Sequence, residues 1–145
     1  MKIRPMILED TNKLDDLMND LGYPSSKSKI QERFNKILGY SDYQTFVAEV
    51  KGNLVGFVGM CKQYAYEFDE PYIRVLALVV HEEFRRDNIG QSLMLAAEDW
   101  AKKNHCVAVI LNSGNREERF AAHNFYKKLG YIGKSTGFSK SLVND

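Results

Sequence analysis

The sequence predicts one α/β domain built on a mixed β-sheet, and three observations support this fold class. Segments with strand and helix periodicity follow one another in the order β-α-α-β-β-β-α-β-α-β. Residues 75–80 form an apolar run, as expected of a strand buried on both faces. The 145 residues are 44% hydrophobic and 27% charged, which suits one globular core and excludes a disordered or fibrous chain. We therefore treat residues 1–145 as a single domain.

The first half of the chain is expected to place two helices between strands. A short strand opens the chain at residues 2–6, and apolar residues then recur at helical spacing over 14–21 and 30–38. Asp10 or Thr11 is a candidate N-cap of the first helix.

A hairpin is expected next. Its strands are residues 45–50 and 54–62, joined across Lys51, Gly52 and Asn53, because Gly and Asn tolerate the positive φ of tight turns. The elements predicted for the second half are a buried strand at 72–80, a helix at 89–104, a buried strand at 107–111, a helix at 119–129 and one or two short strands in 131–143.

Composition excludes several classes of function. A formal net charge of +1 without a basic stripe argues against a nucleic-acid binder. No apolar run approaches the roughly 18–20 residues that cross a bilayer, and no secretory signal opens the chain. Two cysteines form no framework, so a cytoplasmic protein is expected. No histidine or cysteine spacing fits a metal site, so none is predicted.

The turn that follows the apolar strand has features of a phosphate site. Residues 85–90 join that strand to a helix, whose first backbone N–H groups form a natural seat for phosphates. Gly90 permits close approach of the backbone, and Arg85 and Arg86 add charge-assisted contacts. An ordinary β-α connection with a solvated basic edge explains the same local sequence equally well.

Longer motifs occur in register along the chain. They are VAEVKGNLVGFVG at 47–59, VHEEFRRDNIGQSL at 80–93, LNSGNR at 111–116 and AHNFYKKLGY at 122–131. Together they resemble the GNAT-type N-acetyltransferases, whose coenzyme A motif has the core Q/R-x-x-G-x-G/A. Arg85 matches the first position of that core and Gly90 the last. Asn88 stands in place of the first glycine, and asparagine is the best substitute for glycine at positive φ.

The resemblance implies a fold, a co-substrate and a reaction. The fold is the GNAT-type acyl-CoA N-acyltransferase fold, a mixed central sheet with a splayed parallel strand pair and about four flanking helices. The chain would use acetyl-CoA and no metal, and would acetylate a primary amine directly. The implied cofactor-binding residues are Leu78, Val79, Val80, Arg85, Arg86, Asp87, Asn88, Ile89, Gly90, Gln91, Ser92, Asn112 and Arg119.

The resemblance also implies catalytic residues. Tyr126 occupies the position of the family's general acid, and a phenol with a pKa of about 10 suits protonation of a thiolate. Packing in the core is the alternative role of this side chain. Leu76 is apolar where many relatives carry an acidic residue, so we favour Glu49 as the base, with a solvent-facing strand position as the alternative. Carboxylates in the 67–70 loop remain open.

The identity of the acceptor is not encoded in any motif. A small-molecule amine is favoured over a protein amine, and Arg74, Tyr64 and Tyr66 are candidates to line its pocket. Two alternatives from other classes remain: a non-catalytic acyl-CoA-binding or sensing domain, and a protein-interaction domain that forms a homodimer through its edge strands.

Overall fold

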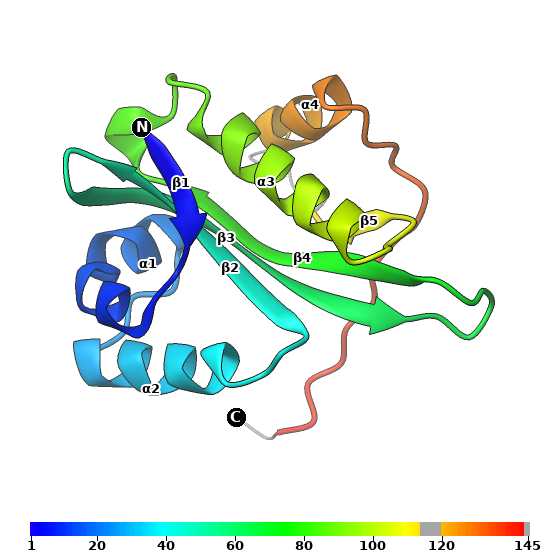
Figure 1. Ribbon diagram of the computed structural model, residues 1–145, viewed down its shortest axis with the longest axis horizontal. Helices are drawn as coiled ribbons and strands as arrows, with labels where there is room; N and C mark the ends of the chain where they lie inside the picture. The colour runs from blue at the N-terminus through cyan, green and yellow to red at the C-terminus, as the bar shows by residue number, and fades with distance from the viewer. Residues whose placement is uncertain (114–119, 144–145) are drawn as a thin grey trace. The chain divides into compact units, whose positions relative to one another are not determined.

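The computed structural model describes residues 1–113 and 120–143. The chain divides into two compact units, Met1–Leu111 and Asn112–Asp145. The first unit holds the β-sheet and most of the helices, and the second holds the last helix and the C-terminal segment (Figure 1).

The first unit is built on a five-stranded sheet in the order β1-β2-β3-β4-β5. The strands are β1 Lys2–Pro5, β2 Tyr43–Val50, β3 Asn53–Tyr64, β4 Pro71–Val80 and β5 Val109–Leu111. β1 to β4 pair antiparallel with their neighbours, and β4 pairs parallel with β5. The sheet is therefore mixed, as predicted.

Helices cover both faces of this sheet (Figure 1). They are the 3-10 helix η1 Leu8–Lys13, α1 Asp15–Leu21 and α2 Lys27–Leu38 on one face, and the 3-10 helix η2 Glu82–Phe84 with α3 Ile89–Lys103 at the other. Val47 and Phe57 belong to the core cluster of α1 and α2, whereas the neighbouring Gly56 meets side chains of α3. Successive strand residues thus point to opposite covered faces.

The close packing of α3 depends on Gly56. A Cβ atom at this position would lie 2.9 Å from the carbonyl oxygen of Val79 and 3.2 Å from Cδ1 of Leu93. Real Cβ atoms do not approach a backbone oxygen so closely. The missing side chain lets the start of α3 settle directly on β3 and β4.

Two local features in the first half of the chain, the loop of the β2–β3 hairpin and the N-cap of α1, differ from the prediction. The hairpin loop has two residues, since Val50 pairs with Asn53, and the positive φ falls on Lys51 (51°) and Gly52 (81°) rather than on Asn53. Positive φ at both loop residues defines a type I′ turn, whose twist matches that of the strands. Asp10 does not cap α1, because η1 precedes that helix and Leu14 is its N-cap.

The parallel pair of strands is short, and this shortness opens one edge of β4. β5 pairs only with residues Ile73 to Val75 of β4 and covers 109–111 rather than the expected 107–111. The run 75–80 is therefore not buried on both faces as expected. Leu76 is 52% exposed, and Val79 is the buried residue beyond it. Beyond Val75, β4 no longer pairs with β5. This separation of the two parallel strands agrees with the splayed pair that the resemblance implies.

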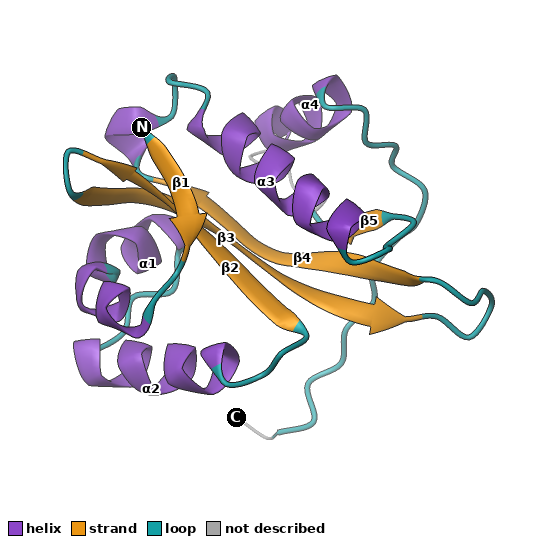
Figure 2. Cartoon of the chain, in the orientation of Figure 1, coloured by secondary structure: helices purple, strands orange, loops and turns teal. Residues whose placement is uncertain are grey.

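The second unit contains α4 Phe120–Lys128 and a C-terminal segment. Gly130 ends the helix with φ 95°, and Tyr131 N–H donates to the carbonyl of Tyr126 at 3.0 Å, as in a Schellman C-cap. The prediction of strands in 131–143 is wrong for the described residues, which form a loop (Figure 2). Apolar residues here are separated by glycine, lysine and serine, which leaves no continuous strand face.

Candidate functional site

The open edge of β4 presents backbone groups. The N–H of His81 donates to the carbonyl of Val55 on β3 at 2.7 Å, so the backbone of His81 faces β3. Because successive residues of a strand direct their polar groups to opposite edges, Val80 and Leu78 face away from β3. The carbonyl of Val80 accepts a hydrogen bond from Nε of Arg85 at 3.1 Å. The side chain of Val79 packs in the core and holds this edge in place.

The turn after β4 has the backbone geometry that the motif predicts. Asn88 has φ 60° and ψ 22°, the left-handed conformation, as expected for a residue that stands where the family core has glycine. Arg85, Arg86 and Asp87 are exposed along the turn. The N–H of Asp87 donates to the carbonyl of Phe84 at 3.2 Å, which closes the turn.

The start of α3 leaves donors for a ligand. Ser92 N–H is bonded to the carbonyl of Asn88 at 3.0 Å, whereas the N–H groups of Ile89, Gly90 and Gln91 precede the first intrahelical bond. Asn88 makes no side-chain cap hydrogen bond. Ile89 is buried and anchors the turn. The positive end of the helix dipole and two exposed arginines therefore point to an anion-binding turn.

A cavity of about 150 Å³ lies beside the open edge, on the face of the sheet that α1 and α2 cover. Leu76 and Ala77 of β4 line it, together with Phe57 and other apolar side chains. Gly59 pairs with Ala77 and Met60 with Val75, so Leu76 is the extra residue of a β-bulge. The bulge turns β4 at the point where the cavity meets the open edge.

A larger groove of about 450 Å³ lies elsewhere, between η1 and α2. Its described lining residues include Leu8, Glu9 and Gln31, and none of them comes from β4. The smaller cavity is therefore the one that belongs with the turn and the strand edge.

The polar residues of the cavity were not predicted from the sequence. They are Arg33 on α2 and Tyr43 and Thr45 on β2. No motif or spacing distinguishes them, and only the packing of α2 over the sheet brings them together. The aromatic candidates Tyr64 and Tyr66 are exposed instead and are not among the cavity's described lining residues.

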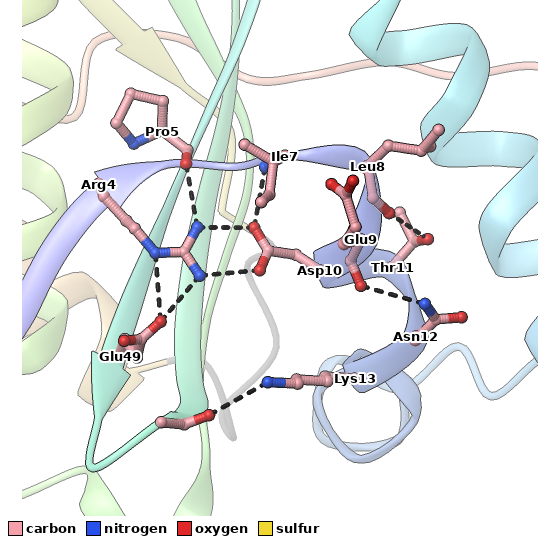
Figure 3. Close-up of polar contacts among 11 residues, drawn as sticks. Arg4, Pro5, Ile7, Leu8, Glu9, Asp10, Thr11, Asn12, Lys13 and Glu49 are labelled. Carbon is pink, nitrogen blue, oxygen red and sulfur yellow. Dashed lines mark hydrogen bonds and ion pairs between the residues drawn. The ribbon is translucent and has the colours of Figure 1, made fainter.

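Glu49 is held in an ion-pair network at the other edge of the sheet (Figure 3). Its Oε1 accepts from Nη2 of Arg4 at 2.8 Å and from Nε at 3.2 Å. The same guanidinium donates to both oxygens of Asp10 at 2.8 Å. These contacts tie β2 to β1 and η1, a structural role for Glu49 that the sequence did not indicate.

The remaining predicted residues lie in the second unit. The Tyr126 ring on α4 contacts the rings of Phe125 and Tyr131, with centroids 5.2 Å and 6.0 Å apart. A Cβ atom at Gly137 would lie 3.5 Å from Nδ2 of Asn112, so the C-terminal segment passes this side chain. Arg119 lies outside the described residues.

Neither cysteine has the surroundings of a nucleophile. Burial raises the pKa of the Cys61 thiol, chiefly by desolvating its charged form, and does the same for Cys106. In the described part of the chain, no group of three metal-ligating side chains is found. No described helix combines the length and the apolar character needed to cross a bilayer.

Comparison with known proteins gives the class to which this fold and site belong. The family model described as "Acetyltransferase (GNAT) family" matches residues 11–131, so the chain belongs to the GNAT acetyltransferase family and has its fold. A solved GNAT family acetyltransferase from Staphylococcus aureus is 34% identical, covers 97% of this chain and 98% of its own, and has a TM-score of 0.85. In a sequence search, no curated protein matches the chain.

Two more distant structures share the fold. Glucosamine-6-phosphate N-acetyltransferase from Arabidopsis thaliana is 23% identical over 98% of both chains, with a TM-score of 0.80. An aminoglycoside N-acetyltransferase in complex with CoA is 18% identical over 98% of this chain and 95% of its own, with a TM-score of 0.84.

Proposed function

We propose that the protein transfers the acetyl group of acetyl-CoA directly to the primary amine of a small molecule. The observation that carries this proposal is the open edge of β4 beside the turn that begins α3. Parallel pairing ends at Val75, and the following backbone leads to a turn whose N–H donors and arginines face solvent. That combination suits a ligand with amide groups at one end and phosphates at the other.

The described residues fit such a ligand. Leu78 and Val80 offer strand backbone groups to the amides of a pantetheine arm, and the N–H groups of 89–91 offer donors to a diphosphate. Arg85 and Arg86 add positive charge at the same turn. A relative of the same fold is described in complex with CoA, which supports this assignment.

Acetyl-CoA supplies an acetyl group activated as a thioester. Transfer to an amine gives an amide and a thiol, so the amine must lose a proton and the departing sulfur must gain one. We assign the second proton to the hydroxyl of Tyr126. Glu49 stays a prediction as the base, and its ion pair with Arg4 is the structural alternative. The cavity's described lining residues include no carboxylate.

The role of Tyr126 is tested by Tyr126→Phe. If the hydroxyl protonates the thiolate, kcat should fall by roughly 10²–10⁴ while the affinity for acetyl-CoA stays the same, since only the transfer step loses its proton donor. Steady-state release of CoA thiol measures kcat, and calorimetry measures binding. An unchanged kcat would leave the side chain with a packing role.

The binding site is tested by thermal unfolding with acetyl-CoA. A ligand at about 100 times its Kd adds about 2.7 kcal/mol to the free energy of unfolding. For a domain of this size that corresponds to a rise in Tm of roughly 5–11 °C, at ~2–4 °C per kcal/mol. Gly90→Glu should abolish the rise, because its carboxylate would occupy the anion-binding turn.

Asn35→Glu is the matched control, because it adds the same charge on the exposed side of α2. It should leave the rise intact. Absence of any rise in the wild-type protein at saturating acetyl-CoA would contradict the proposed site and favour a protein-interaction domain on this scaffold.

One observation supports a non-catalytic acyl-CoA-binding domain as a second candidate. Leu76, at the bulge of β4, offers no carboxylate to accept a proton from an amine. Turnover with any amine would exclude this candidate. We propose for either case a single-domain, cytoplasmic protein that forms a homodimer.

A further inference from the structure

The cavity beside β4 combines an apolar interior with a single charge. Of its described lining residues, Arg33 alone is charged, and Tyr43 and Thr45 are the other polar side chains. Arg33 is exposed whereas its neighbour Phe34 is buried, so the guanidinium lies at the solvent side of the cavity and the apolar residues form its interior.

The charge of Arg33 is not neutralised within the described part of the chain. Among the described residues, its guanidinium donates from Nη2 to Oγ of Ser25 at 3.3 Å, a neutral acceptor. The ion pairs found among residues 1–113 and 120–143 join Arg4 to Asp10 and Glu49, and Lys103 to Asp99. A guanidinium has five N–H donors, so most of those of Arg33 remain for a ligand.

These features select among amines by charge and by size. A cation at the rim repels polycationic acceptors and attracts a carboxylate or a phosphate, which a guanidinium binds through two parallel hydrogen bonds. A cavity of about 150 Å³ with a mainly apolar lining has room for a group about as large as benzene. Leu76 and Ala77 place this volume at the strand edge assigned to the acetyl donor.

We propose that the acceptor is an amine that also carries an anionic group, held by Arg33, and an apolar group, held in the cavity. An α-amino acid with an aromatic or branched side chain has this chemistry. The inference rests on the proposed function, because it assigns the acceptor of the same reaction. Carboxylate and phosphonate acceptors share the required charge, and the experiment distinguishes them.

The experiment compares four amines that share a phenyl group. L-phenylalanine has a carboxylate, 1-amino-2-phenylethylphosphonate has a phosphonate, and L-phenylalaninamide and 2-phenylethylamine have no anionic group. We expect kcat/KM, measured by release of CoA thiol, to be roughly 10- to 100-fold higher for the better anionic amine than for the two others. Equal or higher values for the amide would overturn the inference and favour a peptide N-terminus as acceptor.

Variants assign the preference to one side chain. Arg33→Gln should remove the advantage of the anionic amines, so that kcat/KM for L-phenylalanine falls to about that of 2-phenylethylamine. Arg33→Lys should retain part of the advantage, because an ammonium keeps the charge without the planar pair of donors. Lys36→Gln is the matched control, since it removes a charge from the same helix away from the cavity. An equal loss in Lys36→Gln would show a general field effect and would contradict the inference.

A binding measurement separates this inference from the proposed function. Titration of the protein with each amine, followed by NMR or calorimetry, needs no turnover. Binding of L-phenylalanine or its phosphonate that depends on Arg33 supports the anionic subsite even if no thiol is released. Turnover of all four amines without dependence on Arg33 overturns the subsite and leaves the acetyltransferase in place. If neither kcat/KM nor the affinity for the anionic amines depends on Arg33, the anionic subsite is overturned as well.

Discussion

Asp10 shows how a single buried charge is made stable. The side chain is only 5% exposed, yet both carboxylate oxygens accept from Arg4 and one also accepts from the N–H of Ile7 at 2.8 Å. The hydrogen bonds from Arg4 are the main cause of a pKa held below the usual range of an aspartate. The pKa of Arg4 is raised correspondingly, first by Asp10 and then by Glu49.

The first prediction at the residue scale concerns Asp10→Asn. The change leaves the guanidinium with one charged partner, so the free energy of unfolding at pH 7 should fall by roughly 1.5–3 kcal/mol. A carboxyl whose pKa is lower in the folded state stabilises the fold above its unfolded pKa of about 3.9 and loses that effect as pH falls through the folded value. The difference between wild type and variant should therefore shrink in acid. Denaturant unfolding at several pH values measures it.

Asp99→Asn is the control for this prediction. Asp99 pairs with Lys103 at 2.9 Å on the surface of α3, where both side chains are mostly exposed. Exposed pairs of this kind contribute about 0.3–0.5 kcal/mol. An equal loss in both variants would contradict the view that burial makes the Asp10 pair strong.

At the scale of single elements, the position of α3 is set by a residue outside it. Gly56 lies on β3, opposite Val80, and the space above it is filled by Leu93 and Ile89 of α3. The helix carries the first-turn N–H groups proposed to bind phosphate, so β3 positions donors that it does not itself supply.

The element-scale prediction is that Gly56→Ala destabilises the fold. The new Cβ would meet a backbone oxygen at 2.9 Å, and the strand or the helix must shift to accept it. Overpacking of this kind costs roughly 1–3 kcal/mol. Gly59→Ala on the same strand is the matched control, since its Cβ would meet Oγ1 of Thr45 at 4.0 Å, an ordinary contact. Thermal unfolding of both variants measures the difference, and equal Tm values would exclude the steric role.

At the scale of the whole molecule, the family match covers residues 11–131 and so includes parts of both units. The first unit supplies the strand edge, the turn and the cavity. The second carries Tyr126 and a C-terminal segment in which the predicted strands are not found among the described residues.

The molecule-scale prediction concerns that segment. Backbone N–H groups of 132–143 lack helix and strand pairing in the described structure, so they should exchange with solvent hydrogen far faster than those of β3. Hydrogen–deuterium exchange followed by mass spectrometry measures both in one experiment. Protection of 132–143 comparable to that of β3 would restore the strands that the sequence predicted.

The strengths of the sequence prediction have a common physical cause. Helix and strand ranges and the left-handed conformation of Asn88 depend on neighbouring residues, through periodicity and φ preferences. The prediction failed where one sequence pattern is compatible with two tertiary arrangements. The apolar run at 75–80 was expected to be buried on both faces, but β5 reaches only Val75, and the positive φ of the hairpin fell on Lys51 because of the strand register.

The sequence by itself determined the order of the elements, the turn that precedes α3 and the family resemblance, because each is carried by short segments whose patterns can be recognised without knowing how the segments pack. Only the tertiary structure decided that Glu49 pairs with Arg4, that Gly56 seats α3 and that Arg33 shares a cavity with Leu76. These contacts join residues distant in the chain, and no local pattern specifies which of many possible partners the packed sheet will bring together.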